Sequence, residues 1–320
     1  MHPWRPTAAL ETLRLRARLL GEVRAFFAAR AVLEVDTPLL VQCAVSDPQL
    51  HSAQVRLPGH AGDLFLITSP EYAMKRLLAA GSGDIYQMSH VFRGEEAGRL
   101  HNAEFMLVEW YRRGYTLAAL MHETAQLAGQ LLALPDCTPE LLSYAQAFER
   151  HVGVDPLRLD EAAARALALA HGLDAGAATR FSQPELLDWL MGSVIGPQLG
   201  HERLCCLHHY PAAQASLARL DPADPRLALR FELYFQGVEL ANGFEELADA
   251  REQRTRFQAD RRERQARARP AHAADERLLA ALQAGLPAVA GVALGFDRLL
   301  LLRTGARELA AVMAFALERA

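Results

Sequence analysis

Hydrophobic residues recur at helical spacing near the start of the chain. Over residues 10–30, apolar side chains three and four positions apart alternate with arginines, which is typical of an amphipathic helix with one apolar face. The apolar positions are Leu13, Leu20, Val23, Phe26 and Phe27. The next residues, 32–38, predict a short strand that ends at Pro38, because proline cannot donate to a strand ladder.

Apolar and alternating runs predict strands in two groups along the chain. The predicted strands cover residues 64–68, 85–92, 105–111, 204–210, 227–235, 238–244 and 289–296. A long polar loop separates 85–92 from 105–111, which predicts an antiparallel hairpin. The runs 227–235 and 238–244 surround a glycine turn and predict a second pair of neighbouring strands.

Helical patterns fill most of the remaining chain. Ser69, Pro70 and Glu71 predict a helix start, because serine can cap, proline fits the first turn and glutamate favours the positive helix end. Residues 117–199 are rich in Ala and Leu and mostly helical, and 248–267 predict a charged, solvent-facing helix. Strands grouped at both ends of a helical insertion predict an α+β fold with a mostly antiparallel sheet.

Composition narrows the class of protein. The chain has 320 residues, 51% of them hydrophobic, which suffices for one large domain or two small ones. A net charge of -4 gives no general basic field for nucleic acid. No apolar run spans a bilayer, the N-terminus lacks a signal-peptide core, and the four cysteines lack metal-ligand spacing, so we expect a cytoplasmic protein. A GC-rich codon bias is the simpler explanation for Lys75 being the only lysine.

The stretch 86–111 carries the first group of candidate functional residues. Arg93 stands two residues before Glu95, at the end of a predicted strand. Further polar and aromatic groups follow on the same hairpin: His101, Asn102, Glu104, Phe105, Glu109 and Tyr111. Arginine binds phosphate oxygens with a planar fork, and carboxylates can hold an ammonium group or magnesium. The hairpin therefore predicts a site for a nucleotide triphosphate and a small charged substrate, although a lone strand-end arginine is usually a solvated charge.

A second group follows the strand pattern of residues 239–246. Strand alternation places Glu239 and Asn242 on opposite faces, so the run must bend, and Gly243 permits a bend. Both polar residues lie in a strongly apolar strand, where an unpaired charge is costly. We therefore favour contact with magnesium or substrate over the alternative of surface carboxylates.

The third group is the run from 291 to 298. Its small residues let a backbone approach a ligand closely. Arg298 begins an apolar helix and needs an anion, which is either a ligand or the neighbouring Asp297. The adjacent His208 and His209 cannot share one strand face, and we interpret them as structural.

These groups, in this order, resemble the three motifs of class II aminoacyl-tRNA synthetases. The helix and strand ending at Pro38 resemble motif 1, FRGEEAGRLHNAEFMLVEWY resembles motif 2, and GVALGFDRLLLL resembles motif 3. The sequence is most similar to the lysyl branch in the segments TSPEYAMKRLL, RLHNAEF and VELANGFEELADAREQ. The resemblance covers essentially the whole chain. It implies a class II catalytic core, an antiparallel sheet flanked by helices.

Within the lysyl branch, the chain is most similar to short paralogues that attach (R)-β-lysine to a lysine of bacterial elongation factor P. The motif 1 helix begins almost at the N-terminus, so we expect a single catalytic domain over 1–320, with a helical insertion around 117–200 and no anticodon-binding domain. Lysyl synthetases usually have glycine at the position of Ala293. One extra methyl contributes about 1–3 kcal/mol of discrimination, enough to select a lysine isomer.

The resemblance implies a reaction in two steps. The amino-acid carboxylate attacks the α-phosphate of ATP, and the acceptor lysine then attacks the aminoacyl-adenylate. Mg2+ would accompany ATP, and catalysis would act by alignment and charge neutralisation. A homodimer through the motif 1 helix is expected, and neither a tRNA nor a membrane partner is.

The resemblance also assigns roles to residues. Arg93 would hold the α-phosphate, and Arg298 the γ-phosphate, with Phe105 stacked on the adenine opposite Arg298. The other ATP contacts would be Gly94, Glu95, His101, Asn102, Glu239, Leu240 and Gly295. Glu239 and Glu246 would position magnesium. The amino-acid site would comprise Ser69, Pro70, Glu71, Glu109, Tyr111, Glu246 and Ala293.

Three other functions stay open at this point. A minimal enzyme that charges tRNA would have to bind it through the acceptor stem alone, which the negative net charge disfavours. A catalytically silent regulatory paralogue is disfavoured by the intact Arg93, Glu239 and Arg298. An ammonia-using amide synthetase on the same fold is the weakest alternative, because the lysyl-type wording is so close.

Overall fold

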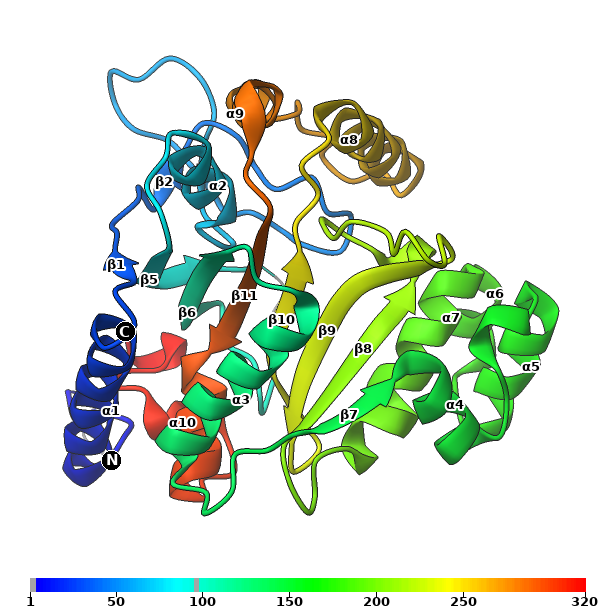
Figure 1. Cartoon of the computed structure of the whole chain (residues 1–320), viewed down its shortest axis with the longest axis horizontal. Coiled ribbons are helices and arrows are strands. Elements are labelled where there is room, and N and C mark those ends of the chain that lie inside the picture. Colours follow the sequence, from blue (N-terminus) through cyan, green and yellow to red (C-terminus); the bar gives the residue numbers. More distant parts are fainter. Residues whose placement is uncertain (1–3, 95–97) are drawn as a thin grey trace. The chain divides into compact units, whose positions relative to one another are not determined.

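The computed structural model describes residues 4–94 and 98–320, and Figure 1 shows their elements coloured along the chain. The predicted ATP contact Glu95 lies outside the described residues. Contacts divide the chain into two compact units. Unit 1 comprises the described residues of Met1–Thr116, Gln130–Leu134 and Glu246–Ala320, and unit 2 comprises Leu117–Gly129 and Pro135–Glu245. The expectation of a single domain stays a prediction.

The main sheet of unit 1 has the strand order β1-β5-β6-β11. Its strands are β1 (Leu33–Glu34), β5 (Ile85–Phe92), β6 (Glu104–Arg113) and β11 (Val289–Gly295). Strand β1 runs parallel to β5, while β5–β6 and β6–β11 are antiparallel. A smaller sheet has the order β2-β4-β3 and consists of β2 (Leu40–Val41), β3 (Gln54–Val55) and β4 (Leu64–Leu66).

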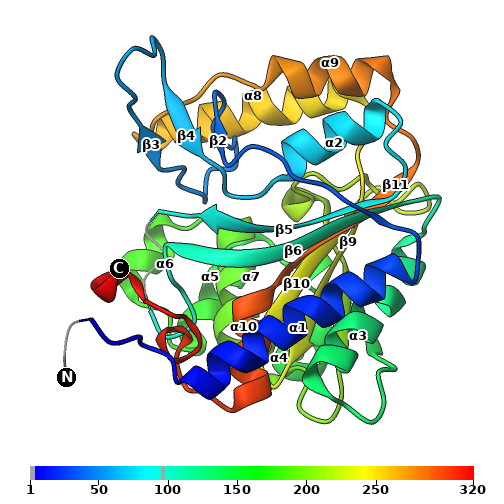
Figure 2. The same cartoon turned by 90° about the vertical axis from the view of Figure 1, so that its left-hand side faces the viewer.

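Helix α1 (Leu10–Ala28) covers one face of the main sheet of unit 1, and Figure 2 shows it lying along β5, β6 and β11. The ring of Phe27 stacks on Tyr86 with 4.3 Å between centroids and lies 5.3 Å from the ring of Trp110. All three side chains are buried, so this face forms an aromatic core. Glu109 and Tyr111 flank Trp110 on β6 and therefore point to the other face.

Within the described residues of unit 1, four further α-helices follow α1. They are α2 (Glu71–Ala79), α8 (Ala250–Ala266), α9 (Glu276–Gly285) and α10 (Phe296–Thr304). Figure 2 shows α8 and α9 side by side, with α2 next to α9. Asp249 and Asp275 accept hydrogen bonds from the second and third backbone N–H groups of α8 and α9, so each helix begins at a local cap.

Unit 2 contains the strand order β10-β9-β8-β7 with helices packed on it. The strands are β7 (Glu140–Ser143), β8 (Cys205–Pro211), β9 (Leu227–Phe235) and β10 (Val238–Glu245). The helices are α3 (Leu117–Leu132), which ends in unit 1, α4 (Tyr144–Val152), α5 (Glu161–Ala170), α6 (Ala175–Arg180) and α7 (Gln183–Leu190), followed by a π-helical turn (Met191–Ile195). Phe148, Leu190 and Leu207 belong to its buried core.

Several predicted elements are confirmed with their bounds. Strands β5 and β9 cover the predicted 85–92 and 227–235, and β5 and β6 form the predicted antiparallel hairpin. The long helix α1 is confirmed and ends at Ala28. Among the described residues, every helix is too short or too polar to cross a lipid bilayer.

Other local predictions need correction. Strand β7 lies within the predicted helical insertion; it is only four residues long and is stabilised by parallel pairing with β8, which no local pattern reveals. The predicted strand 32–38 contracts to Leu33–Glu34, next to β5. The sequence pattern placed Pro70 in the first turn of a helix. Helix α2 instead starts one residue later, at Glu71, and Pro70 is its N-cap.

Candidate active site

The register of the β6–β11 pair gathers the candidate residues on one face of the unit 1 sheet. Tyr111 lies opposite Gly291, Glu109 opposite Ala293, and Leu107 opposite Gly295. Directly paired residues share a face, so the three small residues of β11 lie beside the polar side chains of β6. Small side chains in this row leave room for the larger side chains that pack on this face.

Glu109 is held in place by hydrogen bonds to both of its oxygens. Ser69 Oγ donates to Oε2 at 2.8 Å and Tyr111 Oη donates to Oε1 at 2.7 Å. The side chain is buried. Burial, helped by the nearby charge of Glu71, raises the pKa of Glu109 to about 7. A group of this kind changes protonation near neutral pH when a cation approaches.

Lys75 lies between two further carboxylates. Its Nζ is 2.7 Å from Glu71 Oε1 and 2.5 Å from Glu246 Oε2. The side chains of Lys75 and Glu246 are each only 1% exposed. Burial lowers the pKa of Lys75, but the charges of Glu246 and Glu71 outweigh it, and the pKa lies above its ordinary value. Burial also raises the pKa of Glu246 to about 8, despite the opposing charge of Lys75.

Helix α2 places Glu71 and Lys75 together by its own geometry. The two residues are four positions apart, so their side chains share one face of the helix. At the start of α2, the backbone N–H of Glu71 donates to Ser69 Oγ at 2.9 Å. Although Pro70 occupies the N-cap position, Ser69 Oγ thus accepts from the first backbone N–H of α2 and also donates to Glu109, which ties the helix start to β6.

Gly291 permits the close packing of this carboxylate cluster, defined here as Glu71, Lys75, Glu109 and Glu246. A Cβ on Gly291 would lie 2.3 Å from a ring carbon of Tyr111 and 2.6 Å from Glu246 Oε1. The glycine therefore makes room for the side chains of the site, where the sequence pattern had suggested close approach of a ligand to the backbone.

Arg93 follows β5 and lies near Phe105. Its Nε donates to the carbonyl of Thr68 at 3.3 Å, and its guanidinium carbon lies 5.0 Å from the centre of the Phe105 ring. The neighbouring Gly94 donates its N–H to the carbonyl of His51 at 2.8 Å. The predicted stacking of adenine between Phe105 and Arg298 stays a prediction.

Arg298 and His101 lie together in unit 1. Arg298 Nη2 is 2.9 Å from His101 Nε2, and Arg298 Nε donates to the carbonyl of Leu100 at 3.3 Å. The alternative partner Asp297 uses both of its oxygens elsewhere: Oδ1 pairs with Arg16, and Oδ2 accepts from the N–H of Met106 at 2.7 Å. The nearby Asn102 donates from Nδ2 to the carbonyl of Glu104 at 2.7 Å.

The candidate residues of β10 lie in unit 2, and their strand bends as predicted but at a different place. The register shifts between Glu239 and Ala241, so the extra residue is Leu240, while Gly243 pairs regularly with Phe231. Glu239 consequently lies opposite Tyr234, and Asn242 opposite Glu232. The opposing residues are two apart, so the bulge brings Glu239 and Asn242 to one face.

Beside that face, unit 2 holds a buried ion pair that sequence reasoning missed. Arg230 Nη2 donates to Glu232 Oε1 at 2.5 Å, its Nη1 to the carbonyl of Gln214 at 2.8 Å, and its Nε to Asn242 Oδ1 at 3.2 Å. Tyr234 Oη donates to the other oxygen of Glu232 at 2.7 Å. The alternating polar residues in RFELY, residues 230–234, were the sequence feature that could have indicated this ion pair.

The predicted magnesium ligands belong to different units, Glu239 to unit 2 and Glu246 to unit 1. Within the described residues, no group of three or more acidic, histidine or cysteine side chains could hold a metal ion. Glu246 is paired with the ammonium of Lys75, which fits its predicted amino-acid role better than a metal role. The shared magnesium contact stays a prediction.

The adjacent histidines correct another expectation. His208 and His209 hydrogen-bond to each other through their Nδ1 atoms, although neighbours on a regular strand point apart. A register shift between His208 and Tyr210, with φ of 59° at His209, brings the rings together. Burial lowers the pKa of His208 to about 4, so its ring is neutral in the folded chain.

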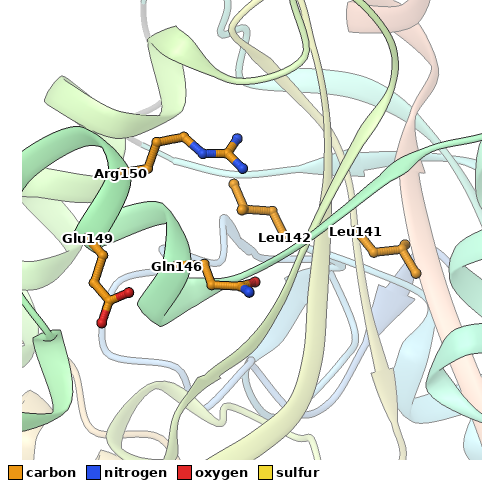
Figure 3. Close-up of a pocket in the computed structure, with 5 residues that line it drawn as sticks. All are labelled: Leu141, Leu142, Gln146, Glu149 and Arg150. Atoms are coloured by element: carbon orange, nitrogen blue, oxygen red, sulfur yellow. The ribbon is translucent and has the colours of Figure 1, made fainter.

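A hollow in unit 2 is lined by none of the candidate residues. Figure 3 shows that it is formed by β7 and α4, and its volume is about 430 Å³. The lining residues are Leu141, Leu142, Gln146, Glu149 and Arg150, none of which the sequence pointed to. Arg150 already pairs with Glu140 at 2.8 Å.

Comparison with known proteins agrees with this arrangement. A family model described as tRNA synthetases class II (D, K and N) matches residues 2–319. Proteins named elongation factor P--(R)-beta-lysine ligase from Salmonella dublin, Salmonella heidelberg and Salmonella agona are each 48% identical over 322 residues, covering 99% of this chain and 98% of the relative. The predicted resemblance and the predicted α+β class II core are confirmed. The chain therefore belongs to the family of class II tRNA synthetases of the D, K and N group.

Proposed function

We propose that the protein is an ATP-dependent ligase that activates (R)-β-lysine and transfers it to a lysine of elongation factor P. The observation that carries the proposal is the charge of the carboxylate cluster. Among the described residues, this cluster sets three carboxylates, Glu71, Glu109 and Glu246, against the single ammonium of Lys75. Two negative charges remain when all four groups are ionised, and a diamino acid carries two ammonium groups to balance them.

The first step joins the amino-acid carboxylate to AMP. A carboxylate oxygen attacks the α-phosphorus of ATP, an O–P bond forms, and pyrophosphate leaves with the electron pair of the broken bond. The guanidinium of Arg93, at the end of β5 beside Phe105, neutralises charge that develops on the α-phosphate. The carboxylate cluster holds the ammonium groups, so the reacting carboxylate is aligned by groups that take no part in bond making.

The second step transfers the acyl group to protein. The neutral ε-amine of the acceptor lysine attacks the carbonyl carbon of the adenylate, an amide C–N bond forms, AMP leaves, and the nitrogen gives up a proton. The acceptor is proposed from the relatives, whose names state elongation factor P and (R)-β-lysine. An acceptor of this kind places the reaction in the cytoplasm and requires no tRNA.

The nucleotide is bound by residues on the hairpin and at the start of α10. Arg298 and His101 provide neighbouring nitrogen donors for the outer phosphates, and Phe105 offers a flat apolar ring to the adenine. The remaining proposed contacts are Gly94, Glu95, Asn102, Glu239, Leu240 and Gly295. Mg2+ enters as the counter-ion of ATP, with Glu239 and Glu246 as its proposed protein contacts.

Ala293 is the proposed selectivity residue. It lies directly opposite Glu109 on β11, so its methyl group shares the face of the carboxylate cluster. It also packs against the small apolar cluster of Ile67, Val91 and Leu107. A methyl fixed beside an ammonium site restricts where the carbon chain of the substrate can carry its amino group.

A homodimer through α1 is part of the proposal. Leu10 on α1 is 57% exposed and Leu33 on β1 is 55% exposed, so this side of unit 1 presents apolar groups to solvent. Sedimentation of the purified chain would test it: a single species at the monomer mass over micromolar concentrations contradicts the dimer.

The deciding experiment measures the intact mass of purified elongation factor P after incubation with the enzyme, ATP, Mg2+ and (R)-β-lysine. The expected result is a mass increase of one lysyl unit that depends on both ATP and amino acid. An unchanged mass, with acceptor that a working relative does modify, contradicts the proposed acceptor. A parallel assay for charged tRNA then distinguishes a tRNA-charging enzyme from a chain without ligase activity.

A further inference from the structure

Lys75 combines two unusual properties. It is the only lysine of the chain, where all other fixed cationic side chains are arginine. It is also buried, with its side chain 1% exposed. A GC-rich codon bias explains why arginine stands in place of lysine elsewhere in the chain. The same bias would favour arginine at position 75, so it does not explain why lysine is retained there.

The contacts of Lys75 show why a compact ammonium is retained. Its nitrogen lies 2.7 Å from Glu71 on α2 and 2.5 Å from Glu246 of the segment after β10, which also donates its backbone N–H to Val289 of β11 at 3.0 Å. One small cation thus connects a helix to a chain segment beside the sheet. A planar guanidinium is larger and has a different donor geometry, so it cannot replace this ammonium without moving one carboxylate.

We propose that Lys75 is a positioning residue for substrate binding, which holds the carboxylates of Glu71 and Glu246 in place so that they accept the ammonium groups of a diamino acid. This inference rests on the proposed function and deepens it. Lys75 does not itself contact the substrate; it acts through the two glutamates. Its own positive charge also repels a substrate ammonium from the space between them, so each glutamate offers the oxygen that faces away from Lys75.

Charge balance predicts what happens without Lys75. The titratable groups that interact with it are Glu71 and Tyr72 on α2, Glu109 on β6, and Glu246. With the substrate bound and Lys75 neutralised, one negative charge of the cluster stays uncompensated. The carboxylates of Glu71 and Glu246 then lose the cation between them and repel each other, so the ammonium groups of the substrate are held less well.

The test compares neutral and charged substitutions by amino-acid-dependent pyrophosphate exchange. Lys75→Met and Lys75→Gln remove the charge, and Lys75→Gln keeps a hydrogen-bond donor should the methionine variant fail to fold. Lys75→Arg retains the charge. Arg76→Met, on the exposed side of the same helix, is the matched control for loss of a cation from α2.

The neutral variants are expected to raise the KM for (R)-β-lysine at about pH 8 by at least about tenfold, the factor that one pKa unit represents. The KM for ATP should stay within about threefold. Lys75→Arg should move the KM for the amino acid less than either neutral variant, because it keeps a positive charge between the two glutamates. Arg76→Met should behave like the wild type.

Because Lys75 is the sole lysine, an amine-reactive label followed by intact mass reports directly on its burial. The folded wild-type chain should take up label at the α-amino group alone, and the unfolded chain at Lys75 as well. Labelling of Lys75 in the folded enzyme contradicts the buried pairing.

The outcomes separate the inference from the function on which it rests. A folded neutral variant with the wild-type KM for the amino acid overturns the role of Lys75 alone, and a lower KM overturns it by showing that Lys75 competes with substrate. Absence of exchange by the wild type with every lysine isomer overturns the proposed function, and the inference with it.

Discussion

Unit 1 and unit 2 both bury charged side chains on neighbouring strands, but they balance those charges differently. In unit 2, Arg230 pairs with Glu232, and further hydrogen bonds from Tyr234 and to Asn242 complete the network. In unit 1, among the described residues, Lys75 is shared by two carboxylates and Glu109 has only hydroxyl donors. A paired network is typical of structural support, whereas surplus buried charge indicates a site that a ligand completes.

The largest expected effect comes from a substitution at the proposed α-phosphate contact in unit 1. Arg93→Ala removes the cation proposed to stabilise the α-phosphate during its transfer, and we expect amino-acid-dependent pyrophosphate exchange to fall by about 10²–10³-fold. The far-ultraviolet circular dichroism and melting temperature should stay near those of the wild type. Normal exchange by a folded Arg93→Ala enzyme would contradict the assignment.

The paired network of unit 2 should respond in stability. Arg230→Met leaves Glu232 buried without its cation, which costs about 3–5 kcal/mol in the free energy of unfolding. The double variant Arg230→Met with Glu232→Leu removes both charges and should recover part of that loss. Urea unfolding of the two variants measures the free energy that is recovered. A double variant that is less stable than the single one would contradict the expected recovery.

Packing at the carboxylate cluster offers a smaller effect. Gly291→Ala forces a methyl against Tyr111 and Glu246, which should lower the free energy of unfolding by about 1–3 kcal/mol and raise the KM for the amino acid. Gly21→Ala on α1 is the matched control, since no atom lies within 4 Å of its added Cβ. That control should leave the KM unchanged. Wild-type kinetics in Gly291→Ala would show that the cluster tolerates displacement.

The smallest expected effect concerns the choice between lysine isomers. Ala293→Gly removes the methyl opposite Glu109 and should improve the use of α-lysine relative to (R)-β-lysine by about tenfold in kcat/KM. Ala290→Gly, on the other face of the same strand, controls for the loss of a methyl from β11. If the substrate preference of Ala293→Gly matches that of the wild type, Ala293 is not the selectivity residue.

Local patterns predicted the elements that carry the site. Strands β5 and β9 have strong apolar patterns and match their predicted bounds, and α1 follows from helical spacing. Strand β7 escaped prediction because four residues show no reliable period and its stability comes from pairing with β8. A short strand that depends on pairing with a distant strand cannot be predicted from its local pattern.

The sequence by itself determined which residue types the site contains, because charged groups inside apolar strands and the motif order are visible along the chain. Only the tertiary structure decided how those charges pair. Lys75 and Glu246 are far apart in sequence, and the bulge that turns Glu239 and Asn242 to one face depends on the register with β9. Pairing between distant segments is set by packing and strand register, and neither leaves a local period in the chain.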